Sequence, residues 1–102
     1  MSLSTHVLDA ARGRPAAGMG VRLDKRDEDG WRTVAEGRTD DDGRLRDLPP
    51  PEKGTYRLVF DTARHSDFYP EVTVAFVVDD PEQHYHVPLL LSPYAYSTYR
   101  GS

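Results

Sequence analysis

Four groups of residues in this sequence carry side chains that can do chemistry. They are His6, the pair His84 and His86, Arg44, and the C-terminal segment 92–102. An imidazole titrates near pH 6.5, so it can accept and return a proton at neutral pH. A guanidinium keeps its charge and offers planar donors to a carboxylate-like or oxyanionic group. The combination is suited to proton transfer beside a developing negative charge.

Each group also has a simpler interpretation. A single strand histidine such as His6 is usually a surface residue, and Arg44, which follows the acidic turn Asp40–Gly43, is placed to form an ion pair with that turn. His84 and His86 project from the same face of a strand, as in some Zn²⁺ and Cu²⁺ sites. A metal site needs a third or fourth ligand, and the sequence has no cysteine to supply one. We therefore expect no bound metal.

The C-terminal segment is unusual because chain ends are normally polar and frayed. This one carries Tyr94, Tyr96 and Tyr99 and then ends in Arg100-Gly101-Ser102. An Arg-Gly-Ser ending is also typical of an artificial tag remnant. Because the tyrosine spacing continues without a break into Arg100, we interpret the last residues as part of the protein.

The elements that must position these residues are strands. Apolar residues alternate with polar ones at a period of two in most segments, which indicates strands with one buried face. The clearest runs are 3–7, 21–23, 56–60, 72–78 and 85–91. Turn signals separate them at short spacing, among them Asp29-Gly30 and Asp42-Gly43. Residues 63–68 are the one place where a short helical turn is expected. The pattern predicts an all-β antiparallel sandwich of seven to eight strands with one short helix.

Composition limits the remaining possibilities. The chain has 102 residues, enough for a single domain over 1–102, with 13 basic against 17 acidic residues and no cysteine. Scattered basic residues and a net charge of −4 argue against nucleic acid as a partner. No apolar run reaches a membrane span and no leader is evident, so we expect no membrane contact and a cytoplasmic location. A core of this size leaves little room for an internal cavity, so we expect any pocket to be shared between copies.

Four ordered motifs resemble the transthyretin-like 5-hydroxyisourate hydrolases over essentially the whole chain. They are Leu3-Ser4-Thr5-His6-Val7-Leu8-Asp9 with Gly13-Arg14-Pro15-Ala16, then Thr39-Asp40-Asp41-Asp42-Gly43-Arg44, then His84-Tyr85-His86-Val87-Pro88-Leu89-Leu90-Leu91-Ser92-Pro93, and the terminal Tyr99-Arg100-Gly101-Ser102. The terminal tetrapeptide distinguishes these enzymes from the transthyretins that carry hormones. One departure is Ala95, where the family pattern has glycine.

The resemblance implies a transthyretin-like (prealbumin-like) sandwich and a homotetramer whose sites lie at the dimer–dimer interface. It implies hydrolysis of 5-hydroxyisourate to 2-oxo-4-hydroxy-4-carboxy-5-ureidoimidazoline in urate degradation, without a cofactor. The catalytic residues it implies are His6, Arg44, His86 and Ser102, and Tyr99, Arg100 and Gly101 line the substrate site. The histidines would transfer protons as water attacks a ring amide carbonyl, and Arg44 would stabilise the oxyanion. His84 matches no catalytic position of the family.

Two other functions remain open at this point. One is a non-catalytic carrier of the transthyretin type, which would hold a small aromatic ligand in the same central channel. Histidines and an arginine at the floor of such a channel argue against it, because burying unpaired polar groups costs free energy. The other is a sandwich domain that binds proteins, in which the histidines have no chemical role.

Overall fold

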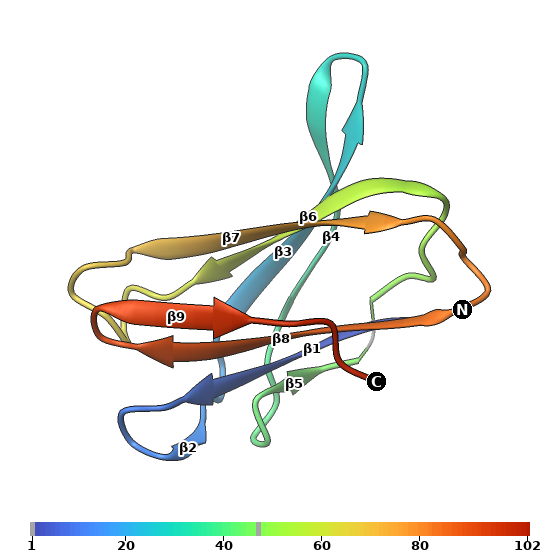
Figure 1. The fold of residues 1–102 in the computed structure, drawn as a ribbon. Helices are drawn as coiled ribbons and strands as arrows, with labels where there is room; N and C mark the ends of the chain where they lie inside the picture. The colour runs from blue at the N-terminus through green and yellow to red at the C-terminus, as the bar shows by residue number, and fades with distance from the viewer. Residues whose placement is uncertain (1, 47) are drawn as a thin grey trace.

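The computed structural model describes residues 2–46 and 48–102 and folds them into two facing β-sheets (Figure 1). The described strands are β1 (Ser2–Asp9), β2 (Arg14–Pro15), β3 (Gly20–Asp27), β4 (Gly30–Arg38), β5 (Arg44–Leu45), β6 (Gly54–Asp61), β7 (Glu71–Val78), β8 (His84–Ser92) and β9 (Ala95–Thr98). The strands of four residues or more include every run in which apolar and polar residues alternate. The predicted all-β sandwich is confirmed.

The first sheet contains the three strands that carry His6, Arg44 and His86. Its order is β2-β1-β8-β9, and β5 pairs with the same edge of β1 that β2 uses further along. The central pair, β1 and β8, runs parallel, whereas the other pairings are antiparallel. The second sheet is antiparallel throughout, in the order β4-β3-β6-β7. Its β3–β4 hairpin extends beyond the body of the sandwich (Figure 1).

The core lies between the two sheets. In β1 the side chains alternate, so that Leu3, Thr5 and Val7 are buried while Ser4 and His6 face outward and are half-buried. The second sheet contributes Leu58, Phe60 and Val72 to the same core. Burying a large apolar side chain stabilises the fold by about 1.5–3 kcal/mol. Because these contacts fix which face of β1 is buried, they also fix the outward direction of His6.

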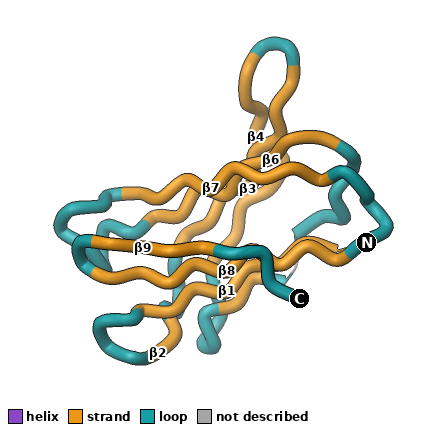
Figure 2. Tube along the Cα trace, in the orientation of Figure 1, coloured by secondary structure: helices purple, strands orange, loops and turns teal. Residues whose placement is uncertain are grey.

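The short helix expected at residues 63–68 is absent. The amides of His65 and Ser66 do hydrogen-bond to the carbonyl of Thr62, which closes one turn. The hydroxyl of Ser66 then accepts the amides of Phe68 and Tyr69 and donates to the carbonyl of Pro93. Because these bonds replace the backbone pattern of a helix, the segment continues as turns and bends (Figure 2). The described residues contain no helix that could cross a membrane.

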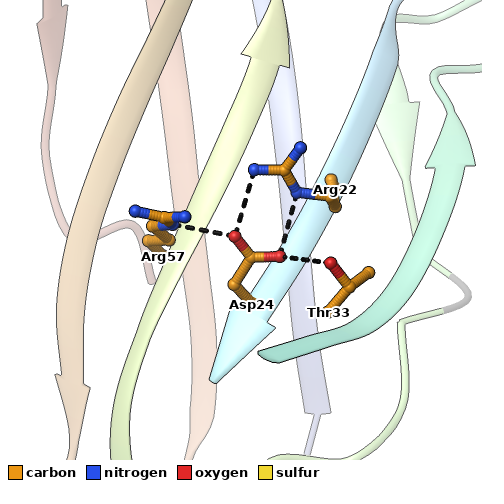
Figure 3. A network of polar contacts seen from close by, with 4 residues as sticks. All are labelled: Arg22, Asp24, Thr33 and Arg57. Atoms are coloured by element: carbon orange, nitrogen blue, oxygen red, sulfur yellow. Dashed lines mark hydrogen bonds and ion pairs between the residues drawn. The ribbon is translucent and has the colours of Figure 1, made fainter. Parts of the chain in front are cut away.

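A network of charges occupies the outer face of the second sheet (Figure 3). The carboxylate of Asp24 is almost fully buried and accepts hydrogen bonds from Arg22, Arg57 and Thr33 at 2.8–3.2 Å. Burial raises the pKa of Asp24, but the hydrogen bonds from the two arginines and the threonine outweigh it, so the pKa lies below its ordinary range. These residues come from β3, β4 and β6, and the network therefore ties three strands together.

Candidate active site

His6 and Arg44 face each other across neighbouring strands. They are directly paired in the antiparallel register of β1 and β5, so both side chains lie on the outer face of the first sheet. Nε2 of His6 lies 2.9 Å from the backbone carbonyl oxygen of Asp42. A carbonyl oxygen only accepts, so Nε2 carries the hydrogen and a neutral His6 has its lone pair on Nδ1.

The turn that precedes β5 holds both residues in place. One carboxylate oxygen of Asp40 accepts the amides of Asp42 and Arg44, each at 2.9 Å. The amide of Val7 in β1 donates to the carbonyl of Gly43 at 2.8 Å. The acidic turn therefore acts through its backbone and Asp40, and no ion pair to Arg44 is formed among the described residues. Asp40 instead approaches Arg46 at 3.6 Å.

His86 lies on the same outer face, one strand away. The parallel register pairs it with Ser4, and the Ser4 hydroxyl is 2.9 Å from Nδ1 of His86. His84 is paired with Ser2 in the same way, and its Nδ1 contacts the Ser2 hydroxyl. The two imidazoles are nearly parallel, with ring centroids 6.3 Å apart. The prediction that both histidines share one face is confirmed.

The C-terminal segment folds back onto β8. The amide of Gly101 donates to the carbonyl of His86 at 2.8 Å, and a Cβ at Gly101 would lie only 2.5 Å from Cδ2 of the imidazole. Arg100 turns away, with its guanidinium 2.7 Å from the side-chain oxygen of Gln83 and 4.6 Å above the ring of Tyr85. Tyr99 is exposed. Ala95 begins β9, and no described residue other than glycine has a positive φ.

These residues surround a shallow recess of about 340 Å³ on the outer face of the first sheet. The lining comes from β1, β5, β8, the residue after β5, and the chain end: Ser2, Leu3, Ser4, Thr5, Arg44, Arg46, His84, His86 and Ser102. Of the seven predicted site residues, Arg44, His86 and Ser102 line the recess. His6 and Gly101 lie beside it, next to Arg44 and His86 respectively. Tyr99 and Arg100 do not reach it in the single chain.

The surroundings of His86 favour its neutral form. Burial lowers the pKa of His86 below its ordinary value, and repulsion from Arg44 and from the protonated forms of His84 and His6 lowers it further. A hydrogen bond with the backbone of Ser4 raises the pKa and does not outweigh them. At neutral pH the ring is therefore available as a proton acceptor.

Sequence reasoning missed Ser2, Ser4, Asp40 and Arg46. The two serines become notable only when β1 is placed beside β8 in parallel register, because they stand 82 residues from the histidines they contact. The sequence drew attention to the charge of Asp40, whereas its role in the structure is to accept hydrogen bonds from the turn amides. The residues described include no group of three histidine, aspartate or glutamate side chains arranged to hold a metal ion.

Comparison with known proteins adds three similarities. A profile of the HIUase/Transthyretin family matches residues 3–101. The 5-hydroxyisourate hydrolase of Caulobacter vibrioides is 48% identical, and the match covers 98% of this chain and 97% of that protein. The structure of Klebsiella pneumoniae 5-hydroxyisourate hydrolase superposes with a TM-score of 0.83 and 34% identity over the full length of both chains.

The backbone alone does not separate enzymes from carriers. The crystal structure of sea bream transthyretin in complex with thyroxine superposes with a TM-score of 0.89 at 32% identity, covering 99% of this chain and 95% of that one. This carrier therefore superposes on the chain at least as well as the Klebsiella hydrolase does. The choice between enzyme and carrier therefore depends on the chemistry of the two histidines and the arginine around the recess.

Proposed function

This chain belongs to the HIUase/Transthyretin family and is one of its hydrolases, and we propose that it opens the ring of 5-hydroxyisourate by histidine-assisted attack of water. The observation that supports the mechanism most directly is the gathering of His6, Arg44 and His86 on one outer sheet face. Two imidazoles and one fixed positive charge are the groups that hydrolysis of a cyclic amide needs.

The reaction follows from what each side chain offers. Water adds to a ring amide carbonyl carbon, and its proton passes to a neutral imidazole, at Nε2 of His86 or Nδ1 of His6. The guanidinium of Arg44 stabilises the negative charge that forms on the carbonyl oxygen. The bond from that carbon to the ring nitrogen then breaks, and the imidazolium returns the proton to the nitrogen. Each of these contributions is worth on the order of 10²–10³ in rate.

The recess has an open side, which supports a shared site. Its lining comes from one face of one sheet and from the chain end, so no described residue of the same chain lies opposite the histidines. We propose a homotetramer in which the outer face of the first sheet of a neighbouring copy closes the recess at the dimer–dimer interface. Tyr99 and Arg100 do not line the recess of their own chain, so the substrate contact that the resemblance implies for them stays a prediction. A cytoplasmic location stays a prediction.

Turnover of freshly generated 5-hydroxyisourate tests the proposal. The decay of its ultraviolet absorbance is followed with and without the protein, because the substrate also decays alone. We expect a large acceleration that falls at least 100-fold in His6→Ala and in His86→Ala. Thr73→Ala, on the exposed face of β7, provides the control and retains the rate. A normal rate in both histidine variants would refute the mechanism.

A non-catalytic carrier is the second candidate, because the backbone superposes on a transthyretin at least as well as on a hydrolase. It predicts tight binding of a planar aromatic ligand without turnover. Calorimetric titration with a slowly reacting urate-like analogue, combined with the turnover assay, separates the two. Binding with no acceleration of substrate decay favours the carrier.

A further inference from the structure

Two serines of β1 contact the two histidines of β8 in the same way. The parallel register places Ser2 beside His84 and Ser4 beside His86, and in both pairs the serine hydroxyl meets Nδ1 of the ring. The Ser4 hydroxyl has no other hydrogen bond among the described residues. The sheet pairing therefore brings a hydroxyl to the rear nitrogen of each imidazole.

Of these two pairs, only Ser4–His86 has an imidazole that is contacted on more than one side. His84 is exposed, whereas the ring of His86 is half-buried and has the backbone of Gly101 packed against its Cδ2 edge. Ser4 occupies Nδ1 from the other side. Among the described contacts Nε2 of His86 has no partner, and the residue lines the recess. Nε2 is therefore the nitrogen of His86 that faces substrate.

A hydroxyl partner suits a ring that must accept a proton. If Nδ1 carries the hydrogen and donates it to the oxygen of Ser4, Nε2 keeps its lone pair and can take a proton from water. The same bond persists in the imidazolium, so the ring does not turn during the cycle. A carboxylate in that position would raise the pKa of the ring strongly, and a neutral hydroxyl leaves it low.

We propose that Ser4 is a positioning residue of the hydrolase, which accepts a hydrogen bond from Nδ1 of His86 and so presents an unprotonated Nε2 to the substrate. The proposal rests on the proposed function as far as turnover is concerned. The state of the ring itself is independent of any activity. Turnover and the position of the hydrogen on the His86 ring can therefore be measured separately.

The kinetic test uses Ser4→Ala, with Ser4→Thr as the conservative replacement that keeps the hydroxyl. We expect kcat to fall about 10–100-fold in Ser4→Ala with KM changed less than threefold, as for other residues that orient a catalytic group. Ser4→Thr recovers most of kcat. Ser2→Ala, which removes the hydroxyl beside His84 at the edge of the recess, loses less than Ser4→Ala, and Thr73→Ala is unchanged. Equal losses in Ser2→Ala and Ser4→Ala, or no rescue by threonine, would overturn the proposal.

The pH profile distinguishes positioning from a general loss of structure. The charged and titratable groups around His86 include His84 on the same strand, His6 on β1, and Arg44 and Arg46 at β5, and Ser102 at the chain end lines the same recess. All of them remain in Ser4→Ala, so the change in profile reports the lost hydrogen bond. Because a hydroxyl oxygen accepts a stronger hydrogen bond from an imidazolium than from a neutral ring, removing the Ser4 hydroxyl moves the acid limb of kcat to lower pH. If the acid limb of kcat does not move in Ser4→Ala and the melting temperature falls, Ser4 has a structural role only.

The ring state is read from ¹⁵N shifts of the histidines in labelled full-length protein above pH 8. We expect His86, assigned with His86→Gln, to carry its hydrogen on Nδ1, and to lose that preference in Ser4→Ala but not in Ser2→Ala. Hydrogen on Nε2 in the unaltered protein would overturn the proposal. If the protein shows no hydrolase activity, the proposed function fails, and this measurement alone still decides whether Ser4 orients the ring.

Discussion

Gly43 lies so close to Val7 that a Cβ added to the glycine would stand 2.5 Å from the valine carbonyl oxygen. The same two residues are joined by a 2.8 Å hydrogen bond from the Val7 amide to the Gly43 carbonyl. Gly43 also has φ +76°, a region that other residues rarely adopt. This contact holds the turn against β1 and so sets the distance between Arg44 and His6.

Gly43→Ala is therefore expected to lower stability by about 3 kcal/mol, since it combines backbone strain with displacement of β1. Gly13→Ala is the matched control, because Gly13 has φ +68° but no atom within 4 Å of the added Cβ. It should lose only the strain contribution, about 1 kcal/mol. Urea unfolding of both variants measures the difference. Equal losses would mean that the close approach to Val7 contributes nothing.

Gly101→Ala tests whether the chain end must pack on the imidazole. The new methyl would overlap the Cδ2 side of His86, so either the ring or the tail must move. We expect kcat to fall about 100-fold, because displacements near 1 Å have that effect at a reacting group. The melting temperature should stay the same, since the tail is largely exposed. Gly20→Ala, whose Cβ would meet only Asp61 at 3.7 Å, should be neutral in both measurements.

The lowered pKa of His86 predicts the pH dependence of the reaction. Because burial and neighbouring positive charges disfavour the imidazolium, His86 stays neutral to lower pH than an ordinary histidine. Activity should therefore decline at a lower pH than it would with an ordinary histidine as the base. His84→Gln removes one of the repelling charges, so the pKa of His86 rises and the acid limb moves to higher pH.

The control for this shift is His65→Gln, which removes an imidazole that pairs with Asp9 away from the recess. Its acid limb should coincide with that of the unaltered protein, although its stability is lower. Rates measured from pH 5 to pH 9 at constant ionic strength provide the comparison. A limb that moves equally in both variants would show that the proximity of His84 is not the cause.

The Asp24 network should contribute to stability in a pH-dependent manner. Its folded pKa lies below the unfolded value, so the contribution is complete above the unfolded pKa and is lost as pH falls through the folded one. Asp24→Asn leaves the partly buried guanidinium groups of Arg22 and Arg57 without a counter-charge and should cost about 2–3 kcal/mol at neutral pH. Its unfolding free energy should also decline less steeply on acidification.

An exposed ion pair provides the comparison for Asp24. Glu52 is 83% exposed where it meets Lys25 at 3.0 Å, so Glu52→Gln should change stability by less than about 1 kcal/mol. Urea unfolding at neutral pH and near pH 4 gives both values and both slopes. If the two variants behave alike, burial of Asp24 has no energetic consequence.

The sandwich could be predicted because its signals are local. The period of two shows which face of each strand is buried, and the turn signal Asp29-Gly30 falls at the β3–β4 hairpin, one residue after the turn residues Glu28 and Asp29 begin. The sequence did not predict the Ser4 contact, since nothing local indicates that β1 and β8 pair in parallel. The helix at 63–68 was wrong because the Ser66 side chain competes for the backbone amides. The resemblance led to His6, Arg44 and His86, but their shared face follows only from the strand register.

Removal of residues 99–102 tests how the chain end serves the site. Gly101 is bonded to His86 of its own chain, and Ser102 lines the recess of that same chain. We expect the truncated protein to lose at least about 10³ in kcat/KM, because both the support of the imidazole and the recess wall are lost. Light scattering should show a mass below that of the full-length assembly, if the tail also contacts the neighbouring copy. Full activity after truncation would contradict a role of residues 99–102 in the site.

Mixing subunits distinguishes a tail that serves its own site from one that serves a neighbour's. Truncated chains and His86→Ala chains are each inactive, and they are unfolded together and refolded so that mixed oligomers form. If tails reached across the interface, a truncated chain would receive one from its partner and activity would return. Because Gly101 contacts His86 within one chain, we expect the mixture to stay inactive. Recovery of activity would require the tail to leave β8 and cross to the partner on assembly.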